Sequence, residues 1–198
     1  MKRSRRDLLL TTAAAAALAG CNREKKRVVA VIPKGSAHVF WQSVHAGSNK
    51  AALETGAEII WNGPAQETDF NGQLQIADAM ITRRVDAIVL APIDKKVVVS
   101  VVERAAAEKI PVVIFDSGID TEKYIAQVAT DNYRGGEMGA ERIGKLLNGA
   151  GKIAMVMVQP GAASTMAREQ GFKDKLAKDF PNIKIVDEKY GWADYAKS

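Results

Sequence analysis

Short apolar runs alternate with longer segments of helical periodicity from residue 28 onward. Residues 28–32 are a continuous apolar run of strand length, which a proline and a glycine close. Such runs are typical of strands buried on both faces, as in parallel sheets. The pattern predicts further strands at 57–61, 86–90, 112–115, 126–129, 152–158 and 183–187, and helices at 39–55, 69–84, 94–109, 132–147 and 164–180. Gly56 is expected to end one helix and Asp131 to cap another, and a last helix is expected to begin at Asp194.

The alternation of strands with long helices predicts βαβ units joined by right-handed crossovers. The expected fold class is therefore α/β, with doubly wound parallel sheets. Gly47 follows Val31 by 16 residues in the first strand–helix pair. Gly171 follows Met155 by the same interval in a later pair, which favours two similar lobes. The second lobe contains few predicted strands, and we expect it to be truncated.

The first 20 residues have the pattern of an export signal. A basic start precedes an apolar run from Leu8 to Gly20, which is shorter than the ~20 residues that a membrane-spanning helix needs. The sequence Leu-Ala-Gly-Cys, which ends at Cys21, resembles a bacterial lipobox, in which the cysteine is lipidated and becomes the new N-terminus. A buried structural cysteine after an alanine-rich helix is the alternative. Arg5 and Arg6 also resemble a twin-arginine signal, which leaves Sec and twin-arginine export both open.

Composition excludes several classes of site. Four basic residues and one acid among the first 20 residues supply +3 of the net charge of +5. The remaining charges of both signs are interspersed, so no basic footprint for nucleic acid is predicted. The single cysteine permits neither an intrachain disulfide nor a thiolate metal site. The expected division of the chain is a signal peptide at 1–20, a lipidated tether at 21–27, a first α/β lobe at 28–125 and a partial second α/β lobe at 126–198.

Polar and aromatic residues follow several predicted strands, at the edge where open α/β sheets bind ligands. Asp116 comes directly after the strand at 112–115, where its carboxylate could accept hydrogen bonds from ligand hydroxyls or serve as a turn residue. Phe40 and Trp41 follow the first strand and could pack against a sugar ring, although one of them is expected to belong to the core. Arg168 could supply a fork of donors to ligand oxygens, or form a surface ion pair.

Motifs of known catalytic sites are absent from the sequence. It contains no nucleophile elbow, zinc-protease helix or Walker loop. Gly135, Gly136 and Gly139 do not make a dinucleotide fingerprint. His38 and His45 lack the clustered carboxylates or thiolates of a metal site. We therefore predict a protein that is not an enzyme and has no cofactor or metal.

Six segments in a fixed order are similar to the type I periplasmic binding proteins, in particular the ribose-binding-like receptors of ABC sugar importers. They are residues 28–33, 39–44 with Gly47, 85–92, 110–117, 130–132 with Gly135 and Gly136, and 168–172. The resemblance implies two lobes that close on a sugar or polyol by hinge motion and deliver it to an ABC permease of the inner membrane. It also implies a monomer in the periplasm, here with a lipid anchor on Cys21.

Carried over by position, the resemblance implies a set of ligand-binding residues. They are His38, Phe40, Trp41, Asp116, Ser117, Arg168 and Trp192. The ribose receptors have asparagine where His38 stands and arginine where Ser117 stands, so pentose specificity is not implied. A receptor that presents a sugar to a membrane signalling protein is the alternative function. A sugar-responsive transcription regulator would need a helix-turn-helix before residue 28, where the export signal stands.

Overall fold

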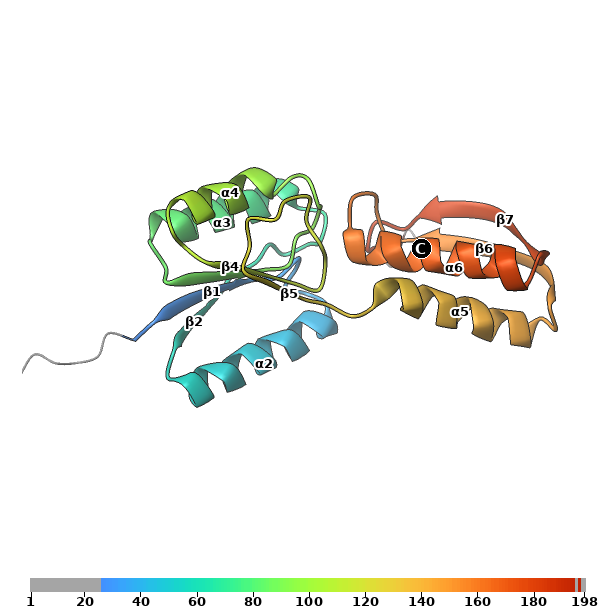
Figure 1. The fold of residues 1–198 in the computed structure, drawn as a ribbon, viewed down its shortest axis with the longest axis horizontal. Coiled ribbons are helices and arrows are strands. Elements are labelled where there is room, and N and C mark those ends of the chain that lie inside the picture. Colours follow the sequence, from blue (N-terminus) through green and yellow to red (C-terminus); the bar gives the residue numbers. More distant parts are fainter. Residues whose placement is uncertain (1–25, 195, 197–198) are drawn as a thin grey trace, which may run out of the picture.

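The computed structural model describes residues 26–194 and 196, which form two α/β lobes (Figure 1). The first lobe contains β1 (Val28–Ile32), α2 (Val39–Thr55), β2 (Glu58–Trp61), α3 (Phe70–Thr82), β3 (Ala87–Leu90), α4 (Val99–Ala107), β4 (Val112–Phe115) and β5 (Ala126–Val128). The second contains α5 (Asn132–Leu146), β6 (Ala150–Met157), α6 (Ala163–Asp179) and β7 (Asn182–Tyr190). The expected signal peptide and Cys21 lie outside the described residues. Within the described part, no helix has the length and apolar character needed to cross a bilayer.

The first lobe is built on a five-stranded parallel sheet in the order β2-β1-β3-β4-β5. Helices α3 and α4 cover one face and α2 lies on the other, so the predicted doubly wound arrangement is confirmed here (Figure 1). The main core fills the space between the sheet and the α3–α4 pair; its fully buried members include Ala30, Ile32, Ile81, Leu90, Val98, Val102, Val112 and Ile114. The strand order reverses between β1 and β3, which is the position where such sheets bind ligands at their carboxyl ends.

Local signals in the sequence account for the ends of three helices. Gly56 has a left-handed backbone (φ 72°) and ends α2, as predicted. The Asp69 side chain accepts a hydrogen bond from Gly72 N and caps α3. Asp131 accepts from Arg134 N at 3.0 Å and caps α5, as predicted.

Several boundaries differ from the sequence prediction; strand β7, for example, ends at Tyr190 and not at 187. Helix α4 begins at Val99 and not at 94, because Asp94 Oδ1 accepts from the backbone N–H groups of Lys96 and Val97 and forms a turn. Strand β5 pairs with β4, so the first sheet extends to Val128 and the second lobe does not begin at 126. The residues after β7 form a turn at 192–193, and most of the helix expected from Asp194 lies outside the described residues.

The described part of the second lobe consists of parallel strands β6 and β7 with α5 and α6. Its core joins both helices to one face of the strands through Ala140, Leu176 and Ile183. Helices α5 and α6 pack closely because of glycine: a Cβ on Gly136 would lie 2.0 Å from the Arg168 carbonyl oxygen. A Cβ on Gly171 would likewise lie 2.1 Å from the Tyr133 carbonyl oxygen. These glycines set the distance between the two helices.

The loops that follow β1 and β3 are joined by one buried side chain of α3. Gln73 Nε2 donates to the carbonyl oxygens of Pro33 (3.1 Å) and Ala91 (2.8 Å). Its Oε1 accepts from Ile93 N at 3.0 Å. All the polar atoms of the amide are thus used to hold two loops at the carboxyl edge of the sheet.

Replacing Gln73 by leucine, which has a similar size, is expected to lower the free energy of unfolding by about 3 kcal/mol, since it leaves buried backbone groups without partners. Urea denaturation measures this loss. Gln75→Leu, on the exposed side of the same helix, is the matched control and should change stability by less than ~0.5 kcal/mol. Equal losses in the two variants would contradict the role assigned to Gln73.

A row of ion pairs links α5 to α6 at the surface. Lys175 Nζ lies 2.7 Å from Asp179 and 3.3 Å from Glu141, which also pairs with Arg134 at 3.0 Å. The hydrogen bond from Lys175 lowers the pKa of Asp179. Hydrogen bonds from Arg134 and then Lys175 lower the pKa of Glu141. Both carboxylates therefore stabilise the fold above their ordinary pKa values, and this contribution is lost as the pH falls through the lowered ones.

Lys175→Met is accordingly expected to lower the melting temperature slightly at pH 7. The difference from wild type should shrink as the pH falls below the ordinary values of 4.5 for Glu141 and 3.8 for Asp179, and also in high salt. Melting curves between pH 2 and 7 test this, with Lys145→Met as the control on an exposed position of α5. A difference that is constant over this pH range would show that lost packing, not lost charge, is responsible.

Candidate functional site

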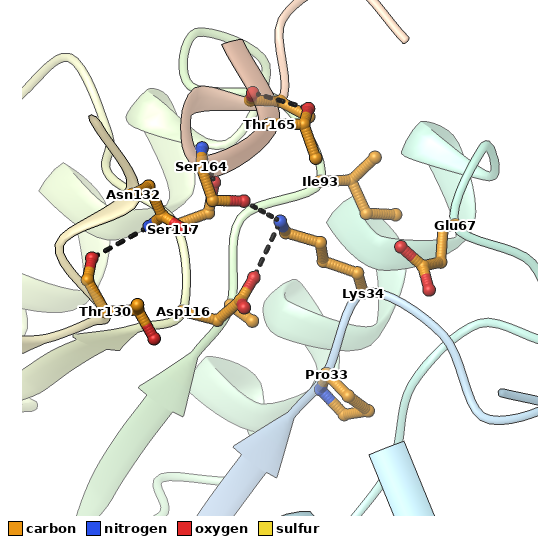
Figure 2. Close-up of polar contacts among 12 residues, drawn as sticks. Pro33, Lys34, Glu67, Ile93, Asp116, Ser117, Thr130, Asn132, Ser164 and Thr165 are labelled. Atoms are coloured by element: carbon orange, nitrogen blue, oxygen red, sulfur yellow. Dashed lines mark hydrogen bonds and ion pairs between the residues drawn. The ribbon is translucent and has the colours of Figure 1, made fainter. Parts of the chain in front are cut away.

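Lys34 follows the carboxyl end of β1 and is buried, with 4% of its surface exposed. Its ammonium nitrogen lies 2.7 Å from Asp116 Oδ2 and donates to Ser164 Oγ at 3.0 Å (Figure 2). A buried ammonium needs such partners, because its removal from water is otherwise very costly. Lys34 therefore joins the end of β1, the end of β4 and the start of α6. We call Lys34, Asp116, Ser117 and Ser164 the interlobe cluster.

Asp116 has a left-handed backbone with φ 62°. Few residues other than glycine adopt this conformation, and aspartate is among those that tolerate it. Its N–H donates to the Val128 carbonyl at 2.9 Å, so the pairing of β4 with β5 holds the turn in place. The turn directs the carboxylate toward Lys34 (Figure 2). Backbone strain of this kind is concentrated at functional positions in proteins.

Ser117 connects the first lobe to the beginning of α6. It is buried, and its Oγ accepts from Ser164 N at 3.0 Å. The first N–H groups of a helix have no partner within the helix, and the N-cap residue Ala162 offers no side-chain acceptor. A hydroxyl of the other lobe therefore takes the place of a cap. A further contact between the lobes joins two backbone groups: Lys95 N donates to the Gly161 carbonyl at 3.0 Å.

A second polar group lies around Glu67. Trp41 Nε1 donates to Glu67 Oε1 at 2.7 Å, and Gln159 Nε2 donates to the Glu67 carbonyl at 3.0 Å. Gln159 follows β6, so this bond also crosses between the lobes. Gln159 is 1% exposed, and its Oε1 has no hydrogen-bond partner among the described residues. A buried acceptor of this kind is unusual in proteins.

The two aromatic residues predicted to follow the first strand, Phe40 and Trp41, differ in burial: one belongs to the core and the other is exposed. Trp41 is 2% exposed and has edge contacts with Phe40 and Phe115. Phe40 is 46% exposed and retains a free surface. His38 caps α2, since its Nδ1 accepts from Phe40 N at 3.1 Å.

The two predicted residues of the second lobe occupy different places. Arg168 Nε donates to Asn132 Oδ1 at 2.7 Å, and among the described residues it forms no ion pair with a carboxylate. Asn132 itself is buried and donates to the Thr130 carbonyl at 2.9 Å (Figure 2). Trp192 follows β7 with φ 55° and is 41% exposed; its ring contacts Tyr190.

Glu169, the neighbour of Arg168, is a partly buried carboxyl on α6. Burial raises the pKa of Glu169, and a hydrogen bond from Val158 N opposes this increase. Glu169 therefore holds the end of β6 to α6.

Sequence reasoning identified Asp116 and Ser117 but missed their partners. Lys34 could have been found by the same rule, because a charged residue directly after a buried strand lies at the ligand-binding edge. Gln159 also follows a predicted strand, at 152–158, but its pairing with Glu67 carries no such signal, and neither does Ser164. Their roles depend on contacts between distant segments. Ser164 is 47 residues from Ser117, and Gln159 is 92 residues from Glu67.

Taken together, the site presents an ammonium, carboxylates, hydroxyls and amides from both lobes. Such a set offers donors and acceptors to a ligand that has both.

Three comparisons relate this geometry to known proteins. The family model of the periplasmic binding protein domain matches residues 29–198. The D-ribose/D-allose-binding protein of Pseudomonas aeruginosa is 31% identical over 176 residues, which are 85% of this chain and 54% of that protein. A solved solute-binding protein of Burkholderia graminis, in complex with D-arabinose, is 35% identical with a TM-score of 0.82 over 87% of this chain and 59% of its own. Another from Agrobacterium vitis, with bound D-fucose, is 34% identical with a TM-score of 0.82 over 86% and 60%.

The chain spans about half the length of the curated relatives it matches. The family match nevertheless covers both lobes, and the similar structures have the same fold. The resemblance found in the sequence motifs is thus confirmed: the chain belongs to the periplasmic binding protein family.

Proposed function

We propose that this protein captures a sugar or related polyol between its two lobes and delivers it to an ABC-type permease. The interlobe cluster is the observation that carries this proposal. At the carboxyl edge of the first sheet, Asp116 is linked to Ser164 of the second lobe through Lys34, and Ser117 accepts directly from Ser164 N. A hydroxyl-rich ligand both donates and accepts, so it matches a site of mixed donors and acceptors.

The residues proposed to contact the ligand have distinct tasks. Asp116 and Ser117 bind hydroxyls, Arg168 donates to ring or hydroxyl oxygens, and Phe40 offers its exposed ring to the C–H face of the sugar. His38, Trp41 and Trp192 complete the set expected from the sequence. Trp41 acts through the packing of Phe40, because its own ring is buried.

The relatives suggest which ligands to test. Their names and titles mention D-ribose and D-allose, xylitol, D-arabinose and D-fucose. These are uncharged pentoses, hexoses or polyols. We propose that the ligand of this protein belongs to the same chemical class.

Ligand binding is tested on the mature protein, produced at the full length of its gene with Cys21→Ser. Thermal unfolding is recorded with each of these five compounds. A true ligand at 100 times its dissociation constant should add about 2.7 kcal/mol of stability, which raises the melting temperature by several degrees. A cooperative transition that none of the compounds shifts would argue against a sugar of this class.

At the same ligand concentration, the shift should become much smaller in Asp116→Asn, because binding is weaker. Asparagine tolerates the left-handed backbone of this position but removes the charged acceptor. Asp187→Asn, at an exposed position of β7, is the matched control and should keep the full shift. A shift of the wild-type size in Asp116→Asn would place the ligand elsewhere.

We further propose that the protein is exported and anchored to a membrane by a lipid on Cys21. The proposal rests on the basic start, the short apolar run and the sequence Leu-Ala-Gly-Cys. Cells that express the tagged protein should incorporate labelled palmitate into it, and Cys21→Ser should abolish the label and release the protein from membranes. Incorporation of label into Cys21→Ser would contradict the assignment. Arg5→Lys with Arg6→Lys distinguishes the export routes, since only twin-arginine export should stop.

Delivery to a permease is tested separately from binding. Deletion of the gene should abolish uptake of the radiolabelled ligand, and a plasmid copy should restore it. Normal uptake in a deletion strain that has lost its transcriptional response to the sugar would instead support a receptor for a membrane signalling protein.

A further inference from the structure

The interlobe cluster contains a charge that the tasks assigned above do not use. Lys34 has 5% of its side chain exposed, and Asp116 has 20%. An ion pair withdrawn from water to this degree is costly unless its hydrogen bonds are well formed. Hydrophobic residues of similar volume often serve stability as well or better. Stability alone is therefore a weak explanation for this pair.

The pair constrains the carboxylate that is proposed to bind the ligand. Rotation of a carboxylate about its last bond is soft, so an unpartnered Asp116 would present its oxygens in many orientations. Lys34 holds Oδ2 at 2.7 Å, which leaves Oδ1 outside this ion pair as an acceptor for a ligand hydroxyl. A fixed acceptor discriminates between hydroxyls that differ only in direction, because binding no longer includes the cost of ordering it.

The constraint extends to the second lobe through a closed loop of contacts. Lys34 donates to Ser164 Oγ, and Ser164 N donates to Ser117 Oγ. Ser117 follows Asp116 directly, so the loop returns to the carboxylate where it began (Figure 2). The orientation of Asp116 thus depends on the position of α6.

We propose that Lys34 is a positioning residue that sets ligand selectivity: its ammonium orients the Asp116 carboxylate, and it does so fully only when Ser164 of the second lobe is in contact. This inference rests on the proposed function. It adds that the selectivity of the site between sugar epimers is built jointly by the two lobes.

The test uses D-ribose and D-arabinose, which differ only in configuration at C2, and calorimetric titration of the full-length mature protein. Lys34→Met should weaken the tighter of the two complexes about tenfold or more and bring the two affinities closer together. Lys50→Met, at an exposed position of α2, is the control and should change neither affinity. In an Asp116→Asn background, Lys34→Met should cost no more than about twofold, because its effect passes through Asp116. Equal losses for both sugars, or losses that simply add in the double variant, would overturn the proposal.

Ser164→Ala gives a second route should Lys34→Met fold poorly. It retains the ion pair and removes only the hydroxyl of the second lobe, and it should also reduce the ratio of the two affinities. Ser100→Ala, at an exposed position of α4, is its control. An unchanged ratio in Ser164→Ala would remove the second lobe from the proposal.

If the wild-type protein binds neither sugar, the coupling between Lys34 and Asp116 is measured without ligand, by thermal unfolding. The double variant Lys34→Met with Asp116→Asn should then melt several degrees above Lys34→Met alone, because it retains no unpaired buried carboxylate. A double variant that melts no higher than Lys34→Met would overturn the positioning role. A failed proposed function and a failed positioning role therefore give different results.

Discussion

Five parallel strands with one reversal of order place all their carboxyl ends at the same edge of the first sheet. The site depends on this constraint. Lys34 follows β1 and Asp116 follows β4, two strands that are not neighbours in the sequence and are separated in the sheet only by β3. Gln73 then ties the loops after β1 and β3 together from beneath. Residues of the first lobe alone therefore connect the loops at this edge.

The second lobe completes the edge through its helix α6. The first turn of a helix has free N–H groups, and one of them is satisfied by Ser117 of the first lobe. The same residue, Ser164, supplies the acceptor for the buried ammonium of Lys34. Glycines between α5 and α6 fix the position of α6 in its own lobe. Packing inside the second lobe therefore controls the geometry of polar contacts between lobes.

Charge burial links this geometry to recognition. A lysine and an aspartate are held out of water by contacts from three chain segments, and the carboxylate lies on a strained turn. Such an arrangement is maintained only when the surrounding fold pays for it, which is common at binding sites. Among the relatives, names and titles mention D-ribose and D-allose, xylitol and D-arabinose, which are uncharged sugars or polyols.

Sequence patterns by themselves determined the α/β class, most elements, the caps at Gly56 and Asp131, and the family. They also indicated Asp116 and Ser117, because buried strands and the residues that end them are local signals. The pairing of β5 with β4, the late start of α4 and the contacts that Lys34, Ser164 and Gln159 make were decided only by the tertiary structure. Each of these depends on a contact between distant segments, and neither periodicity nor capping rules contain information about which distant groups meet.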